Sequence, residues 1–176
     1  MKTFIAISFL LIIGKVSSSN WANELDGFLK FECPEAESIS FIESLHDNDS
    51  EDRIWRFECG PVNGTFNSCS WSGEVNNLDE PLLFECQNGA GVITGMESDH
   101  DNDQEDRRWN FKCCTLEKMC YSECGFSSYV NDFDDPLEFR VDTGYYLTGA
   151  ESIHDNKPED RRWKYQTCQL APCGQL

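Results

Sequence analysis

Basic residues are scarce in this sequence of 176 residues, in which 14 lysines and arginines face 32 aspartates and glutamates and the formal net charge is −18 at pH 7. This excess of negative charge repels phosphate backbones, so we expect no nucleic-acid partner. Helical periodicity is weak, and after residue 13 no apolar run is long enough to span a bilayer. No Gly-x-Ser-x-Gly or His-Glu-x-x-His motif is present. We therefore expect a β protein that is not an enzyme and does not insert into membranes.

The start of the sequence is unlike the rest. Lys2 precedes an apolar run from Phe4 to Ile13, and small residues follow. This pattern predicts a secretory signal peptide over residues 1–18, whose removal leaves a net charge of about −20. A secreted chain with ten cysteines is expected to form disulfides. The sequons at Asn48 and Asn63 predict glycosylation on exposed loops.

Histidine occurs only three times, with a spacing of 54 residues, and each histidine opens a nearly identical segment. The segments are HDNDSEDRIWRF at 46–57, HDNDQEDRRWNF at 100–111 and HDNKPEDRRWKY at 154–165. Upstream of them lie LDGFLKFEC, LDEPLLFEC and FDDPLEFRV, beginning at Leu25, Leu78 and Phe133. We predict one domain over residues 19–176 that contains three repeats, at about 19–62, 69–115 and 124–173.

Within each repeat the apolar residues alternate, as they do in strands. Arg107, Trp109, Phe111 and Cys113 share one parity. Each repeat is expected to form a short strand, a polar link, a second strand, an acidic loop and an Arg-x-Trp-x-Phe strand. Three such units cannot each bury a core alone. We therefore predict an all-β, disulfide-rich fold with pseudo-threefold closure, trefoil-like or prism-like, and keep a linear array as the alternative.

When the three repeats are compared, cysteines are present or absent in pairs. Cys33 and Cys59 correspond to Cys86 and Cys113, and the third repeat lacks both positions. Cys69 and Cys114 of the second repeat correspond in the same way to Cys124 and Cys168 of the third, and the first repeat lacks both positions. Although sequence alone allows many connectivities, these paired losses predict five disulfides: Cys33–Cys59, Cys86–Cys113, Cys69–Cys114, Cys124–Cys168 and, from the remaining two, Cys120–Cys173.

The Arg-x-Trp-x-Phe half of the motif is expected to be structural. Large aromatic residues dominate burial in β domains, so packing is favoured over a sugar-stacking platform. An arginine on the same strand face needs a carboxylate partner, which the neighbouring aspartates or the recurrent Asp26, Asp79 and Asp134 could supply. The residues assigned this role are Arg53, Trp55, Arg107, Trp109, Arg161 and Trp163.

The His-Asp-Asn half is expected to reach solvent and to bind a ligand, with an Asx-rich hairpin loop as the alternative. The candidate residues are His46, Asp47, Asn48, His100, Asp101, Asn102, His154, Asp155 and Asn156. An EF-hand is excluded because Asp106 stands where that loop needs glycine, although weak surface calcium binding is allowed. A zinc site would require the three histidines to converge on the pseudo-threefold axis. We expect no metal and no cofactor.

The repeated EDRRW motif, the segment FDDPLEF and the linker CCTLEKMCYSEC resemble the dermatopontin family, and HDNxxEDRRW resembles its invertebrate hemagglutinin/amebocyte aggregation factor branch. The resemblance covers the mature chain. It implies a secreted, disulfide-rich, non-enzymatic protein that acts in cell adhesion, matrix assembly or agglutination. Lectins, shell matrix proteins and a cytotoxin occur in this family, and its vertebrate members, which are tyrosine-rich, bind proteoglycans and collagen.

We expect a secreted, multivalent adhesion or agglutination protein, lectin-like, whose partners are cell-surface glycans or glycoproteins and extracellular-matrix components. Three weak sites would gain avidity by acting together. The alternative is an acidic matrix or biomineral-associated protein, suggested by the net charge. A toxin would need an amphipathic membrane-inserting segment, which the sequence does not show.

Overall fold

The computed structural model describes residues 20–87 and 90–174, so the predicted signal peptide lies outside the described residues. The described elements are β1 (Leu29–Glu32), β2 (Glu37–Asp47), β3 (Asp52–Pro61), β4 (Phe66–Glu74), β5 (Leu82–Glu85), β6 (Gly91–Asp101), β7 (Asp106–Leu116), β8 (Met119–Phe126), β9 (Leu137–Arg140), β10 (Tyr145–Asp155) and β11 (Asp160–Pro172). Every one is a strand, in agreement with the predicted all-β class. Within the described part of the chain, no helix is long and apolar enough to cross a membrane.

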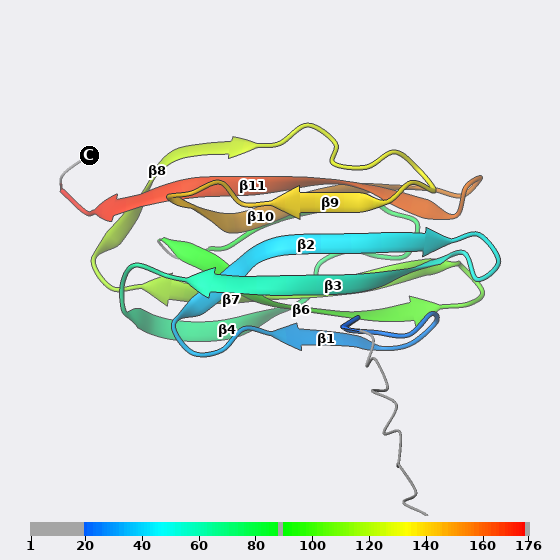
Figure 1. Cartoon of the computed structure of the whole chain (residues 1–176), viewed down its shortest axis with the longest axis horizontal. Coiled ribbons are helices and arrows are strands. Elements are labelled where there is room, and N and C mark those ends of the chain that lie inside the picture. The colour runs from blue at the N-terminus through cyan, green and yellow to red at the C-terminus, as the bar shows by residue number, and fades with distance from the viewer. Residues whose placement is uncertain (1–19, 88–89, 175–176) are drawn as a thin grey trace, which may run out of the picture.

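Each repeat contributes a short strand followed by a long hairpin. The hairpins are β2–β3, β6–β7 and β10–β11, and their acidic loops connect antiparallel strands. At the end of each hairpin the histidine pairs with the arginine of the same motif, as in His100 opposite Arg107. In Figure 1 all three hairpin turns lie at the right-hand end of the molecule. We call this the hairpin end, defined by the turns at 48–51, 102–105 and 156–159.

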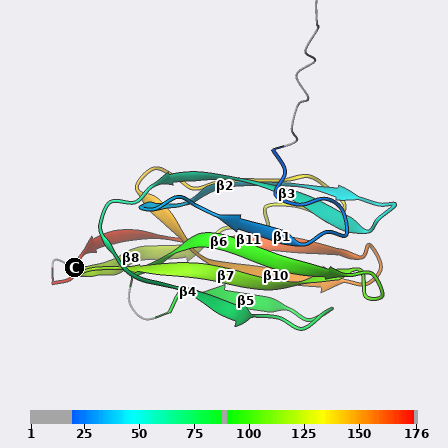
Figure 2. The same cartoon turned by 90° about the horizontal axis from the view of Figure 1, so that it is seen from below.

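The repeats exchange their short strands. The three sheets have the orders β1-β6-β7-β4, β5-β10-β11-β8 and β3-β2-β9. Thus the first repeat gives β1 to the second, the second gives β5 to the third, and the third gives β9 back to the first. Figure 2 shows β2 and β3 on the upper side of the molecule and β4 and β5 on the lower side. Because the third repeat completes the sheet of the first, the alternative of a linear array is wrong.

Two strands were not predicted. β4 pairs with β7, and β8 pairs with β11, so each extends a sheet beyond the hairpin. Both strands span the start of a predicted repeat and the residues just before it, and neither contains a fully buried residue. Their apolar pattern is therefore too weak for the alternation rule to detect.

The Trp-x-Phe residues form the centre of the core. The indole rings of Trp55, Trp109 and Trp163 meet edge to face, with centroids 4.9–5.6 Å apart. All three are at most 1% exposed. The packing interpretation is confirmed, and because these rings are buried they cannot stack on a sugar.

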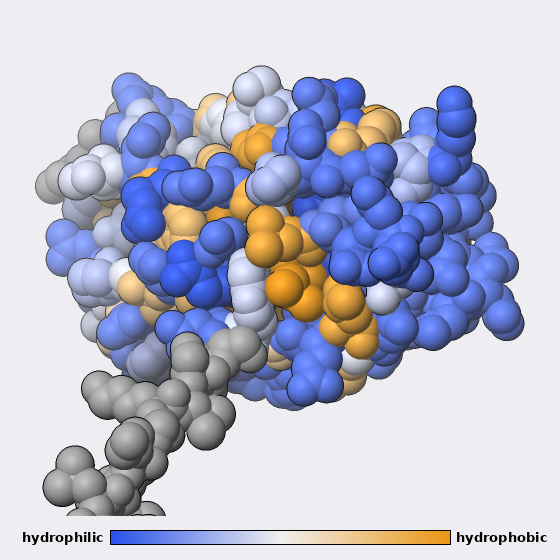
Figure 3. All heavy atoms as spheres, turned by 45° about the vertical axis from the view of Figure 1, so that its right-hand side comes forward, coloured by the Kyte–Doolittle hydropathy of each residue, from blue (hydrophilic) through white to orange (hydrophobic). Residues whose placement is uncertain are grey.

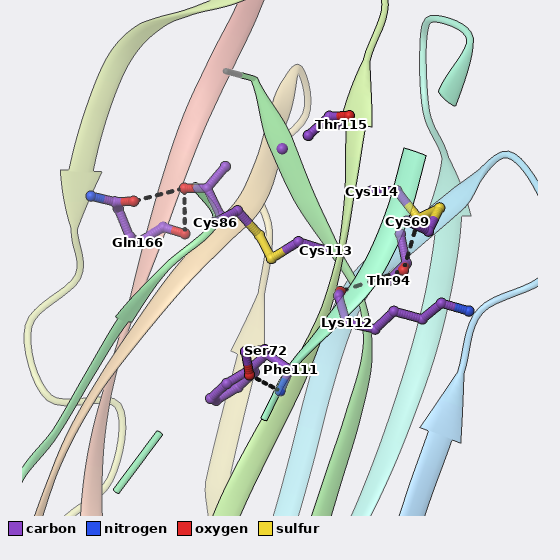
Figure 4. Close-up of a disulfide and its surroundings, with 12 residues drawn as sticks. Cys69, Ser72, Cys86, Thr94, Phe111, Lys112, Cys113, Cys114, Thr115 and Gln166 are labelled. Carbon is purple, nitrogen blue, oxygen red and sulfur yellow. Dashed lines mark hydrogen bonds between the residues drawn. A yellow bond between two sulfur atoms is a disulfide. The ribbon is translucent and has the colours of Figure 1, made fainter. Parts of the chain in front are cut away.

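The five disulfides in the structure join the five predicted pairs. Figure 4 shows how the adjacent residues Cys113 and Cys114 point to opposite sides of β7, one toward Cys86 and the other toward Cys69. Since Cys86 follows β5, the bond to Cys113 joins two sheets. Cys33–Cys59 likewise joins the sheet containing β1 to the sheet containing β3. Two of the three junctions between sheets therefore carry a disulfide.

The third junction offers a test of this arrangement. Val141 follows β9 and Thr167 lies in β11, with the same separation of 26 residues that Cys33 and Cys59 have. We expect the double substitution Val141→Cys and Thr167→Cys to form a sixth disulfide. It should raise the free energy of unfolding by about 2–4 kcal/mol, because it restricts the unfolded chain. Guanidinium unfolding of the double variant, compared with both single variants, measures this gain, and a free thiol pair in the purified double variant would contradict the prediction.

Candidate functional site at the hairpin end

Three arginine–aspartate pairs form a closed ring at the base of the hairpins. Arg107 donates through Nε and Nη2 to both carboxylate oxygens of Asp52, each at 2.7 Å. Arg161 binds Asp106, and Arg53 binds Asp160, in the same two-pronged way at 2.6 Å. The side chains of all three pairs are at most 5% exposed. Each pair joins two repeats, so the arginine–carboxylate fork is structural and ties every junction between sheets.

The aspartates of this ring also anchor the turns before the short strands. The backbone N–H of Asp26 donates to Oδ2 of Asp52 at 2.9 Å, and Asp79 and Asp134 do the same in the other repeats. These turn residues have positive φ angles of 58–62°, a conformation that aspartate adopts more easily than most residues. Of the two carboxylate sets offered by the sequence, the arginines therefore bind the buried aspartates of the motif. The partner comes from a different repeat, which sequence reasoning did not predict.

Three buried asparagines complete the frame and were missed in the sequence. Asn76 accepts a hydrogen bond from the backbone N–H of Trp109 and donates through Nδ2 to the carbonyl oxygens of Arg107 and Asn77. Asn23 and Asn131 make the equivalent three bonds in their repeats. The sequence pattern that could have identified these asparagines is Asn-x-Leu/Phe-Asp, which recurs at 23–26, 76–79 and 131–134.

We expect Asn76→Ala to lower the free energy of unfolding by about 2–3 kcal/mol. The substitution removes three hydrogen bonds and leaves the buried N–H of Trp109 without an acceptor. Asn77→Ala is the matched control, because the neighbouring side chain is exposed and should tolerate truncation. Urea unfolding followed by tryptophan fluorescence compares the two. Equal effects would show that the Asn76 side chain does not hold the turn.

The three histidines do not reach solvent, and that prediction is wrong. The side chains of His46, His100 and His154 are each 1% exposed. They point inward because the strand alternation continues to the end of the hairpin, where Met96, Ser98 and His100 share the inner face. Each histidine faces carboxylates of a neighbouring repeat at 3.5–4.0 Å.

The other two residues of the His-Asp-Asn motif have different roles. Asp101 accepts hydrogen bonds from the backbone N–H groups of Asp103 and Gln104, and so closes its own turn. Asp47 and Asp155 close the other two turns in the same way. This is the Asx-rich loop of the alternative interpretation. The remaining members, Asn48, Asn102 and Asn156, are exposed at the tips.

Negative charge accumulates around the ring. Burial raises the pKa of the Glu105 carboxyl; His100 partly offsets this, and the charges of Asp26, Glu159 and Glu51 raise it further. A cavity of about 30 Å³ is lined by the three buried tryptophans, by the ring residues, and by His100, His154, Glu51, Glu105 and Glu159. Among the described residues, the histidines do not form one common ligand group; each belongs to its own group with two aspartates. The geometry required for one axial zinc ion held by three histidines is absent from the described part of the chain.

Comparisons with known proteins agree with the features of this fold. The dermatopontin family model matches residues 23–173. The chain is 42% identical to the hemagglutinin/amebocyte aggregation factor of Limulus polyphemus, over 96% of this chain and 98% of that protein. It is 41% identical to dermatopontin of Biomphalaria glabrata, over 79% of this chain and 93% of that protein.

A third relative is cytotoxin-1 of Millepora dichotoma, with 39% identity over 83% of this chain and 65% of that protein. The names of the first and third relatives describe a hemagglutinin or aggregation factor and a cytotoxin, and none of the three names denotes an enzyme. No solved structure matches the chain significantly. The family match spans the three repeats, their disulfides and the ring that joins them. The chain belongs to the dermatopontin family.

Proposed function

We propose that this protein is a secreted, non-enzymatic cell-adhesion or agglutination protein that binds cell-surface or matrix glycans through the hairpin end. The observation that carries the proposal is the gathering of three similar, polar hairpin tips at that end of the molecule (Figure 1). In Figure 3, where this side comes forward, the right-hand part of the surface is mainly hydrophilic. A relative named as a hemagglutinin and aggregation factor supports the same function. Five disulfides and the predicted signal peptide support secretion.

The closed exchange of short strands supports a second part of the proposal. We infer that the three repeats are related by an approximate threefold axis through the tryptophan cluster, in a trefoil-like or prism-like closure. The arginine–aspartate ring follows the same cyclic order. Under this arrangement the three tips have equivalent surroundings, so they should bind the same ligand.

The ligand contacts assigned to the tips differ from those expected from sequence. Since the histidines are buried and the aspartates hold the turns, the asparagines are the members of the His-Asp-Asn motif that remain available to a ligand. An asparagine side chain offers both a donor and an acceptor, which suits the hydroxyl groups of a sugar. Asp47, Asp101 and Asp155 fix the shape of the loop that presents them.

Valency at one end has a specific consequence for agglutination. Three tips on one end allow several weak contacts with a single cell, with an avidity gain on the order of 10²–10⁴. Bridging of two cells also requires a second binding surface that faces away. We therefore expect agglutination to require self-association of the protein, whereas attachment to one cell does not.

A glycan array probed with and without calcium chelation tests the proposed ligand class. Binding that is lost in Asn102→Ala but kept in Asn77→Ala, an exposed residue that is not part of any of the three turns, supports glycan recognition by the tips. Hemagglutination inhibited by the same sugars connects binding to function. Absence of any glycan binding by the folded protein would reject the lectin-like proposal.

The number of working tips should depend on glycosylation. Asn48 is exposed at the first tip and lies in a sequon, so a glycan there would cover that site. We expect a glycosylated preparation to bind two ligands per chain and Ser50→Ala to bind three. The substitution should preserve the turn, because the hydrogen bond from residue 50 to Asp47 is donated by the backbone N–H and not by the serine hydroxyl. Calorimetric titration measures both values, and one ligand per chain in both preparations would show that a single unique site binds.

The acidic composition favours a second candidate function. With a formal net charge of −18 the protein could act as a matrix or biomineral-associated component. Adsorption to calcium carbonate that salt abolishes, without inhibition of any cell-binding activity by sugars, would support this alternative.

A further inference from the structure

Each buried histidine at the hairpin end lies in a cluster of carboxylates at a junction between repeats. The clusters are His46 with Asp134 and Asp160, His100 with Asp26 and Asp52, and His154 with Asp79 and Asp106. In every cluster the histidine comes from one repeat and both aspartates come from another. The ligand atoms of each cluster lie within 4.8 Å of one another.

The cluster at His100 shows the geometry. Its Nε2 atom lies 3.8 Å from Oδ1 of Asp52 and 3.7 Å from Oε2 of Glu105. Its Nδ1 atom lies 3.8 Å from Oδ1 of Asp26. These separations are too long for hydrogen bonds. The two separations from Nε2 are close to the roughly 3.3 Å that separates ligands of a tetrahedral ion bound at about 2.0–2.1 Å, whereas Nδ1 lies 3.3 Å from Oδ1 of Asn102 and is hydrogen-bonded to it.

Each imidazole is buried with at least one ring nitrogen that has no hydrogen-bond partner, although Nδ1 of His100 and of His154 bonds Oδ1 of Asn102 and Asn156 at 3.3 and 3.4 Å. Within the described residues, Nε2 of His100, Nε2 of His154 and both ring nitrogens of His46 have no such partner. Because a buried polar atom without a partner is costly, it requires an explanation. An ion bound between the nitrogen and the carboxylates would supply one.

The charge balance also favours a cation. Three carboxylates and one guanidinium surround His100, an excess of two negative charges. The ring arginine neutralises one carboxylate only, since Arg107 is committed to Asp52.

We propose that the hairpin end binds up to three divalent transition-metal ions, zinc being the type, one at each junction between repeats. The ligands are one histidine nitrogen and the two aspartates of each cluster. Glu51 and Glu105 add a fourth ligand at His46 and His100. A mixed nitrogen and carboxylate set suits zinc, whereas calcium prefers six to eight oxygen ligands.

The third cluster is expected to fill last. Its histidine is 4.0 Å from Asp106, the longest of these contacts. Asp79 also accepts a hydrogen bond from Nδ2 of Asn156, which competes for that carboxylate. Ions at these positions would link the repeats at the same junctions as the arginine–aspartate pairs.

A titration of the wild-type protein tests the proposal without relying on any variant. The mature protein is stripped of metal, labelled with ¹⁵N and titrated with zinc chloride while the three imidazole signals are followed by NMR. We expect all three to shift and to saturate at three equivalents, with His154 last, and we expect calcium to move none of them. Imidazole signals that respond to pH but not to zinc would overturn the proposal, and so would zinc binding that leaves the imidazoles unchanged.

Variants identify the ligands. His100→Gln should reduce the zinc stoichiometry by one equivalent in calorimetry. Asp99→Asn, which removes an exposed carboxylate on the opposite strand face next to it, should leave the stoichiometry at three. Equal stoichiometry in the two variants would contradict the assignment.

The substitution Glu105→Gln tests whether Glu105 is a metal ligand or has only a structural role. In metal-free protein this substitution removes the burial cost of the charged carboxylate and its repulsion from Asp26, Glu159 and Glu51, which together outweigh the lost attraction to His100, so the thermal midpoint should not fall. In the presence of zinc it should weaken one of the three sites by at least about tenfold, since a charged ligand is lost. Unchanged zinc affinity at all three sites would exclude Glu105 as a ligand, and a lower midpoint in metal-free protein would contradict the repulsive arrangement on which the proposal draws.

Discussion

Replacing Arg107 with methionine is expected to lower the free energy of unfolding by about 3–5 kcal/mol. Methionine fills much of the space of the arginine stem but cannot donate to Asp52, whose carboxylate is 2% exposed. The loss also removes the bonds from Arg107 to the carbonyl oxygen of Gly27 and to the hydroxyl of Ser98. A buried negative charge would then lack its main partner at the junction between two repeats. Guanidinium unfolding of the oxidised protein, followed by tryptophan fluorescence, measures the effect.

The adjacent arginine provides a matched control. Arg108 is 42% exposed and lies 3.4 Å from Glu74, so Arg108→Met should change stability by no more than about 0.5 kcal/mol. Combining Arg107→Met with Asp52→Asn removes the orphaned charge and should recover part of the loss. If Arg107→Met and Arg108→Met have equal effects, the ring does not stabilise the junctions.

Trp109→Ala is the second substitution with a large expected effect, again about 3–5 kcal/mol. The indole ring contacts Trp55 and Trp163 edge to face, at centroid distances of 5.0 and 4.9 Å. Its removal therefore leaves a cavity that borders all three repeats. Thermal unfolding should show a lower midpoint, and near-ultraviolet circular dichroism should lose intensity from the coupled indoles.

Trp71→Ala is the comparison for this prediction. Trp71 lies on β4, is partly exposed, and has the ammonium group of Lys30 5.2 Å from its ring centroid. Truncation there should cost clearly less than at Trp109, because less apolar surface is buried. A loss at Trp71 as large as that at Trp109 would contradict the central role of the tryptophan cluster.

The sequence predicted what depends on alternation within a repeat. The short strands, the long hairpins and the inward direction of Trp109 follow from the period of two, and the disulfides follow from paired losses between repeats. The same rule could have placed the histidines. His100 continues the inner face of Met96 and Ser98, but the acidic composition of the following loop suggested exposure instead.

What the sequence could not supply was the identity of the partner repeat. Because the three motifs are nearly identical, Arg107 could equally pair with the aspartate of its own repeat or with either of the others. The exchange of β1, β5 and β9 decides this, since it places Asp52 next to Arg107 and Asp160 next to Arg53. Such exchange depends on how the sheets close, which is a tertiary property with no local signal.

The pairing of β9 with β2 determines when the sheet of the first repeat can be completed during synthesis. Phe41 pairs with Arg140 and Ile42 with Phe139, so the first repeat is completed by residues synthesised almost 100 positions later. At about 5–20 residues per second, the edge of β2 waits on the order of 5–20 seconds for its partner strand. Throughout that interval it can pair with another nascent chain. The sheet begun by the first repeat is therefore completed only after the sheet β1-β6-β7-β4 has been made in full, and the time needed to synthesise the residues between β3 and β9 sets how long that edge is open.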